Sequence, residues 1–363
     1  MTFKHTAGKH TPVRDRSGFT IVELAAVIAI LTTLAALLGP AAGKMRSQAR
    51  GITSESRLNT IGQASAMYSM DSQGAIATFN WQPGETYVDL RSGNSFVPSS
   101  QNDAAAYQAR DILYRATGRL NGQFRILAPF SRLVHRRYSH LVLADYMGTV
   151  GQDLWADPND YNQLIWQLAP TSYSFVPYGD GSPPFGYDSS FSWATSSIYQ
   201  MWAFGSSYQT VPFAWMPDFA PTYAPLSQTP HLLTVAGSGG FSLGGREQTE
   251  VRFPSSKVFM FEEFDRERVG DPYFAYDYTT PAKLMFDGSI NTMETARAKS
   301  AVSPDLYSFG SKRAWSQRYL PIDTFPLPMG GAGDQTELDM RYRWTLEGLQ
   351  GVDYTRTLSR PRR

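Results

Sequence analysis

The chain of 363 residues contains no cysteine. This absence excludes a disulfide framework, a zinc site built on thiolates and catalysis by a thiol. The chain also lacks an excess of charge of one sign, because 33 Lys and Arg face 32 Asp and Glu and leave a net charge of +1. This balance gives no support to a nucleic-acid-binding protein, so we predict no nucleic acid among the partners. Apolar residues make up 42% and charged residues only 18%, which indicates a folded chain with a buried core.

The amino terminus, residues 1–18, is polar and basic and reads as a leader peptide. It holds four basic residues, Lys4, Lys9, Arg14 and Arg16, and one acidic residue, Asp15. Its net charge is therefore +3. Residues 19–43, FTIVELAAVIAILTTLAALLGPAAG, are apolar apart from Glu23 and several Thr and Gly. As a helix they would extend about 37 Å, which exceeds the hydrocarbon core of a bilayer, about 30 Å thick. We therefore expect a single transmembrane helix, with the basic leader in the cytoplasm and the remainder outside.

Glu23 distinguishes three interpretations of the apolar segment. The segment is a secretory signal cut between Ala36 and Ala42, a plain membrane anchor, or an anchor that assembles with sister subunits. A carboxylate near the centre of a bilayer costs roughly 2.5–3.5 kcal/mol, and the first two interpretations leave this cost unexplained. An amino group of a neighbouring subunit would compensate Glu23, and we therefore favour the third interpretation.

The run GFTIVELAAVIAIL at 18–31 resembles the class III signal of type IV prepilins and of the pseudopilins of type II secretion. The resemblance implies cleavage by prepilin peptidase between Gly18 and Phe19 and N-methylation of the new terminus. It also implies that Glu23 pairs with the terminal amine of a neighbouring subunit. Pro40 falls where many family members have a helix-kinking proline. The implied partners are prepilin peptidase, other pilin or pseudopilin subunits, and the inner-membrane assembly platform.

The resemblance also implies a location and a function. The chain would cross the inner (cytoplasmic) membrane once, with its head outside the cytoplasm, and would enter a periplasmic or cell-surface filament after assembly. We expect a subunit of a type IV pilus or of a secretion pseudopilus, and a minor subunit because the head is large. We expect no enzymatic activity. The alternative is a membrane-tethered exported binding or enzymatic domain that uses a prepilin-type anchor.

Beyond the apolar segment, residues 44–70 show apolar side chains at helical spacing, which predicts an amphipathic continuation of the helix. Asp71-Ser72-Gln73-Gly74 would end it, and Gly62 would let a sheet pack closely. Residues 71–363 contain short aromatic or β-branched runs between turns, which predicts an exported β-rich globular head. The expected fold class is α+β, a long N-terminal helix packed against a C-terminal antiparallel sheet. Within the head we expect strands at 231–235, 249–253, 257–264 and 283–288, and a helix at 104–117.

Two segments, 57–76 at the end of the expected helix and 341–354 in the head, resemble parts of a large prepilin-like family common in Planctomycetes. That family often carries a histidine, nine further residues, and then Asp-Gly. Here Asp287 and Gly288 supply the last pair, and Asp277 stands at the position of the histidine. We therefore mark these three residues as a candidate head-domain motif without an assigned chemistry.

Patterns that resemble catalytic motifs have simpler explanations. Residues 240–244 match G-x-S-x-G, but a hydrolase of that type needs a later histidine, and none follows His231. His135 and His140 are five residues apart, off the shared face of a metal-binding helix, and we expect them in a solvated basic patch. Glu262, Glu263 and Asp265 are expected at a solvated strand end. We assign no catalytic residue.

We assign no metal ligand and predict no cofactor. Some pseudopilins bind calcium in loops of the head, and Asp71 and Asp287 lie in turns. Binding of a calcium ion by the head is therefore an alternative. Neither turn matches the spacing of acidic residues in a calcium-binding loop.

Overall fold

The computed structural model describes residues 20–90, 92–118, 135, 138–148, 153–160, 163–164, 205–218, 226–228, 233–235, 242–268, 272–301, 316–318 and 337–355. The chain divides into two compact units, Met1–Ala49 and Arg50–Arg363. Gly18 and Phe19 lie outside the described residues, as does the side chain of Pro40. Within the described part, no helix has the length and apolar character needed to cross a membrane.

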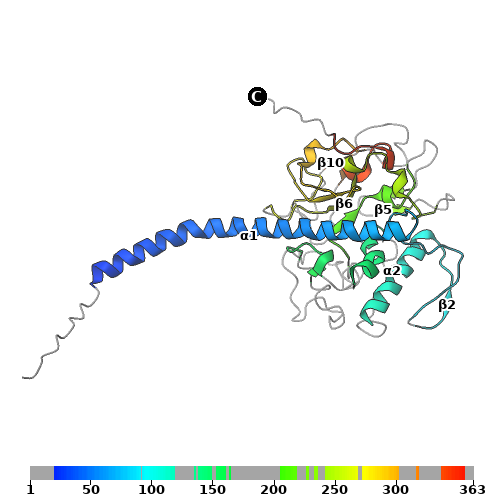
Figure 1. The fold of residues 1–363 in the computed structure, drawn as a ribbon, viewed down its shortest axis with the longest axis horizontal. Helices are drawn as coiled ribbons and strands as arrows, with labels where there is room; N and C mark the ends of the chain where they lie inside the picture. Colours follow the sequence, from blue (N-terminus) through cyan, green and yellow to red (C-terminus); the bar gives the residue numbers. More distant parts are fainter. Residues whose placement is uncertain are drawn as a thin grey trace, which may run out of the picture. The chain divides into compact units, whose positions relative to one another are not determined.

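Helix α1 (Ile21–Asp71) begins in the first unit and ends in the second (Figure 1). Its helical backbone is not interrupted at Pro40. In the first unit its described large apolar side chains are exposed, from 87% at Ile21 to 42% at Val27. The helix ends at Asp71 in the predicted turn, where the Gly74 amide donates to the Ser69 carbonyl at 2.7 Å.

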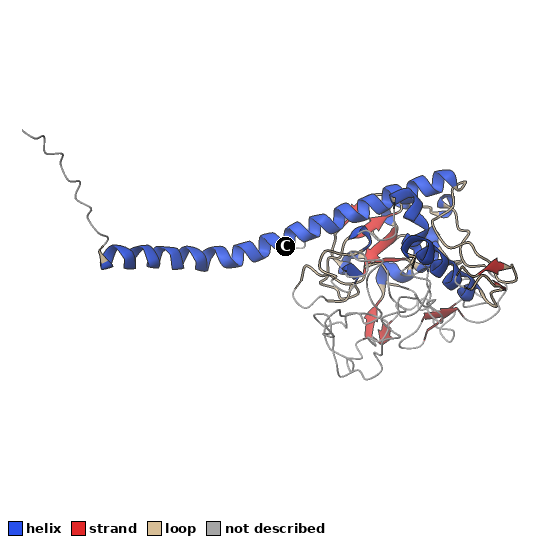
Figure 2. Cartoon of the chain, turned by 90° about the horizontal axis from the view of Figure 1, so that it is seen from below, coloured by secondary structure: helices blue, strands red, loops and turns tan. Residues whose placement is uncertain are grey.

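In the second unit, the last turns of α1 pack on a four-stranded antiparallel sheet. The strand order is β3-β6-β7-β8, formed by β3 (Tyr208–Thr210), β6 (Val258–Glu262), β7 (Lys283–Met285) and β8 (Ile290–Asn291). Leu58 and Ile61 of α1 are fully buried in one apolar cluster with Leu284 of β7. A Cβ atom at Gly62 would lie 2.9 Å from Leu284 Cδ1, so glycine permits this close packing, as predicted. The sheet lies along this part of α1 in Figure 2.

Helix α2 (Gln101–Thr117) confirms the helix predicted at 104–117. It begins at Ser100, whose side chain caps the Asp103 amide, and ends at Gly118. Its buried face packs on η2 (Ser139–Leu143), which continues into α4 (Ala144–Met147). Three further antiparallel pairs are β1 (Tyr87–Val88) with β2 (Ser95–Phe96), β4 (Leu226–Gln228) with β5 (Leu233–Val235), and β9 (Ser316–Arg318) with β10 (Glu337–Asp339).

Short 3₁₀ helices supply much of the remaining described structure. They are η3 (Asp153–Trp155), η4 (Pro212–Ala214), η5 (Gln248–Glu250), η6 (Pro254–Ser256), η7 (Thr295–Arg297), η11 (Arg341–Trp344) and η12 (Gly348–Gln350). The strand predicted at 249–253 is wrong, because Glu247 and Glu250 form a reciprocal cap that closes η5. The strands predicted at 231–235, 257–264 and 283–288 correspond to β5, β6 and β7. The α+β class of the whole chain stays a prediction.

The segment 341–354 contributes large side chains to the core. Tyr342, Trp344 and Leu349 are fully buried and belong to the same apolar cluster as the sheet. Its main chain is bound to η6, just before β6, because the Ser256 carbonyl accepts from the Asp353 amide at 2.9 Å. The end of the described chain is therefore an integral part of the head.

Candidate functional site

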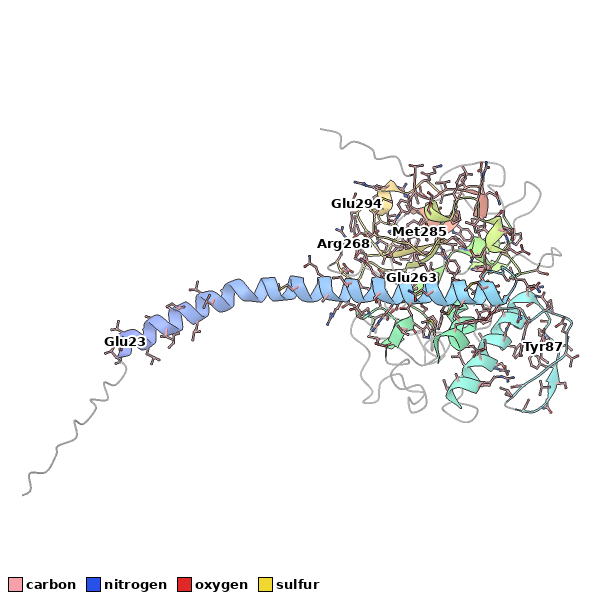
Figure 3. The ribbon with its side chains drawn as sticks, viewed as in Figure 1. Glu23, Tyr87, Glu263, Arg268, Met285 and Glu294 are labelled. Carbon is pink, nitrogen blue, oxygen red and sulfur yellow. The ribbon has the colours of Figure 1, made fainter. Side chains whose placement is uncertain are left out.

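The first turn of α1 contains Glu23, the residue that the sequence singles out for assembly (Figure 3). The amide and the hydroxyl of Thr20 both donate to Glu23 Oε2 at 2.9 Å, and the Glu23 amide donates to Thr20 Oγ1 at 3.3 Å. This is a capping box, which satisfies backbone donors at the start of a helix. Sequence analysis missed this role, although the spacing Thr-x-x-Glu signals it. Glu23 therefore stabilises its own helix, and its carboxylate is still exposed.

Apolar side chains lie on all sides of α1 before and after Glu23 in the first unit. They include Val22, Leu24, Val27, Ile28, Ile30 and Leu31, which are 42–77% exposed. Because successive residues of a helix point in different directions, this exposure surrounds the helix axis and is not confined to one stripe. Exposed apolar surfaces of this extent mark sites of interaction with proteins or membranes.

Asp287 and Gly288 of the candidate head-domain motif form the turn between β7 and β8. Asp287 Oδ1 accepts from the amide of Ser289 at 3.0 Å and from its hydroxyl at 2.6 Å. Gly288 has a φ of +83°, a left-handed conformation that glycine adopts with little strain. The pair thus has a structural role as an exposed hairpin turn.

Asp277 lies in a different environment from Asp287. Its Oδ1 atom accepts from Arg341 Nη2 at 2.7 Å, and Arg341 Nη1 also donates to the Ala298 carbonyl. This ion pair attaches the start of η11 to the segment before β7. Among the described residues, no contact joins Asp277 to Asp287, so the motif does not form one site there.

The acidic residues at the end of β6 are buried, so their predicted place at a solvated strand end is wrong. Glu262, Glu263 and Asp265 are only 4%, 3% and 2% exposed. The reason is that α1 covers this end of the strand, where the Ser54 hydroxyl donates to Glu262 Oε1. The Ala282 amide donates to the other carboxyl oxygen of Glu262 at 2.9 Å.

Glu262 belongs to a buried polar cluster. Its other members are Ser54, Asp157, Asp160, Tyr208 and Arg266. Burial, and then the neighbouring charge of Asp157, raise the pKa of Glu262 to about 8. Burial also raises the pKa of Asp157. Arg266 Nη2 donates to Asp160 Oδ2 at 2.8 Å, and the Tyr208 hydroxyl lies 2.9 Å from Ser54 Oγ. The cluster is shielded from solvent and connects α1 to β3 and β6, so its geometry suits attachment of the helix to the sheet.

The two histidines are also buried, which makes their predicted place in a solvated basic patch wrong. His135 stacks on Trp215 with ring centroids 5.2 Å apart, and burial lowers its pKa to about 3. The ring centroids of His140 and Trp155 are 4.8 Å apart. Both rings fill an aromatic core, where a neutral imidazole packs like an apolar ring. The described residues contain no group of three or more side chains that could hold a metal ion.

A cleft of about 680 Å³ lies between the end of α1, α2 and α4. Its walls include Ile112 and Leu141, and its polar groups include Arg115 and Asp145. The Gln108 side chain in the cleft accepts from the amides of Asn80 and Trp81 at 2.8 and 2.9 Å. Sequence analysis missed the cleft because its walls come from elements that are far apart in the chain.

Comparison of the chain with protein families, with curated proteins and with solved structures finds no match.

Proposed function

We propose that the chain is a prepilin-like subunit, cut by prepilin peptidase after Gly18 and assembled through α1 into a type IV pilus or a type II secretion pseudopilus. The observation that carries the proposal is the run GFTIVELAAVIAIL behind a basic leader. The apolar surface that surrounds α1 in the first unit supports it. Such a surface fits a helix that moves from lipid into a bundle of sister helices.

The proposal divides the work between the two units. The start of α1 would make the contacts with other subunits and with the inner-membrane assembly platform, and Glu23 would pair with a neighbour's terminal amine. The head would stay outside the cytoplasm and perform no chemistry of its own. Its large size favours a minor subunit over an abundant one.

The test is the mass of the N-terminal peptide of the chain purified from the membrane fraction. A peptide that begins at Phe19 and carries one added methyl group supports the proposal. Gly18→Ala should leave the precursor uncut, whereas Gly8→Ala, a matched change within the leader, should leave processing normal. An intact Met1, or a cut near Ala42, would contradict the proposal.

The cleft beside α2 favours one alternative, a membrane-tethered exported domain that binds a ligand. In that case the head would bind its ligand with the same affinity whether or not Gly18 is processed. A Gly18→Ala chain that keeps full biological activity at the membrane would favour this alternative over filament assembly.

A further inference from the structure

We propose that Lys257 and Asp353 form an intramolecular amide bond that ties the end of the described chain to the start of β6. Lys257 immediately precedes β6, and its Nζ atom lies 3.3 Å from Asp353 Oδ2. The side chains are 0% and 1% exposed. This proposal concerns the head alone and is independent of the proposed assembly through α1.

The neighbours of the pair hold both groups in position. The Val258 amide donates to Asp353 Oδ2 at 2.8 Å. The Thr345 hydroxyl contacts Lys257 Nζ on one side and donates to Asp353 Oδ1 on the other. The ring of Phe213 lies 5.8 Å from Nζ and contributes to the apolar surroundings. An amine and a carboxyl group are thus held together out of contact with solvent.

These surroundings favour the uncharged forms that the reaction requires. Burial lowers the pKa of Lys257, although the charges of Asp353 and Asp218 oppose this shift. Burial also raises the pKa of Asp353, against the effect of Lys257. Proton transfer from the ammonium to the carboxylate converts the ion pair into an amine and a carboxylic acid without any net change in charge.

The reaction is a condensation that requires no oxidant, reductant or added reagent. The lone pair of Lys257 Nζ attacks Cγ of Asp353, and an N–C bond forms. The C–OH bond then breaks, and the hydroxyl group leaves as water with a proton that comes from Nζ. Because the Thr345 hydroxyl touches both groups, it can accept the proton from nitrogen while it donates its own to the departing oxygen. The products are one amide and one water molecule.

Lys283 provides an internal control. It is also buried, and burial lowers its pKa to about 7. Its Nζ atom, however, donates to the main-chain carbonyls of Pro281 and Met293 at 2.6 and 3.0 Å. A peptide carbonyl lacks the hydroxyl leaving group of a carboxylic acid, so we expect Lys283 to keep a free amine.

The experiment is tryptic digestion of the denatured full-length chain followed by mass spectrometry. An amide at Lys257 blocks cleavage after that residue, so we expect a branched peptide of residues 253–266 and 344–356 that weighs one water molecule less than its two parts. Cleavage after Lys283 should be normal in the same digest. Free peptides 253–257 and 344–356 as the main species would overturn the proposal.

Two variants provide an independent readout in a denaturing gel. The amide would retain a closed loop of residues 257–353 after unfolding, so the wild-type chain should migrate faster than Lys257→Arg or Asp353→Ala. The digest of Asp353→Ala should release the linear peptide 253–257. Equal mobility of the wild type and both variants would contradict the amide. The wild-type digest decides the question even if neither variant folds.

Discussion

Glu23 has an observed role in capping α1 and a proposed role in assembly, and substitutions can separate the two. The capping box is a local hydrogen-bond pattern, and a glutamine at its third helical position can form it as well as a glutamate. The proposed pairing with a neighbour's amine requires a negative charge. The same side chain can therefore satisfy its own helix in every state of the subunit and bind a neighbour only after assembly.

We expect the Glu23→Gln chain to insert into the membrane normally and to keep the start of α1. Its entry into filaments should be lost, and the loss should be as severe as in Glu23→Ala. Thr20→Val is the matched control, because it removes the hydroxyl bonds of the cap and keeps the charge, and it should still assemble. The measurement is the ratio of subunit in sheared filaments to subunit in the membrane. Normal assembly of Glu23→Gln would restrict this residue to helix capping.

The raised pKa of Glu262 predicts how this residue makes the stability of the head depend on pH. The folded chain keeps a proton on this carboxyl group up to about pH 8, whereas the ordinary pKa is 4.5. Folding therefore takes up a proton at Glu262 in this window, and the contribution of this group to the free energy of unfolding should fall as pH rises from about 4.5 to about 8. For one group the slope is at most about 1.4 kcal/mol per pH unit. Two groups act in the opposite direction, because burial lowers their pKa. His135 does so between about pH 3 and 6.5, and Lys283 does so above its pKa of about 7.

We expect Glu262→Gln to make the slope of the free energy of unfolding against pH more positive than in the wild type between about pH 4.5 and 8. A glutamine amide can donate to the Ser54 hydroxyl and accept from the Ala282 amide, so the fold should survive. The measurement is urea unfolding across a pH series, with Asp287→Asn in the exposed turn as the control. A wild-type slope in Glu262→Gln would assign the proton uptake to another group, such as Asp157, whose pKa is also raised.

At the scale of elements, the turn of the β7–β8 hairpin explains why Asp287 and Gly288 stand at these two positions. We expect Gly288→Ala to lower the free energy of unfolding by about 1 kcal/mol, because alanine is strained at a φ of +83°. Asp287→Asn should change it by less, since an asparagine oxygen can accept the same bonds from Ser289. Chemical denaturation of the two variants measures both effects. A loss of assembly in a normally stable Asp287→Asn chain would indicate a binding role that the turn does not explain.

Elements that are determined by residues close together in the sequence could be predicted from it. The end of α1 at Asp71, helix α2, and strands β6 and β7 each follow from local periodicity and turn residues. The burial of His135 and Glu262 could not be predicted, because Trp215 and Ser54, which cover them, are distant in the chain. The segment 249–253 has the alternation of a strand, but the cap formed by Glu247 and Glu250 was the stronger local signal. The cleft beside α2 has no sequence signal at all.

For the whole molecule, the packing of α1 determines which fragment can fold. Leu58 and Ile61 are fully buried against the sheet, and each contributes about 1.5–3 kcal/mol by its burial. Their sum is a large share of the roughly 5–15 kcal/mol that stabilises a typical protein. We expect a chain that begins at Arg50 to fold with a cooperative unfolding transition, and a chain that begins at Ser72 to lack one.

Circular dichroism during heating of the two fragments tests this expectation. A fragment that begins at Arg50 and carries Leu58→Ala is an intermediate case, which should fold but lose about 2–5 kcal/mol. Cooperative unfolding of residues 72–363 alone would show that the end of α1 is dispensable to the head.

The burial of residues 341–354 in the same core as α1 has a consequence for the order of events during synthesis. The ribosome makes Leu58 and Ile61 early, but their partners in β6 and β7 follow some two hundred residues later, and Trp344 follows β7 by about sixty more. Contacts so distant along the chain form slowly, and apolar surface that waits for them is prone to aggregation. We therefore expect the nascent chain to need protection until residues 341–354 have been made, and a premature stop anywhere before residue 341 to yield a product that is degraded.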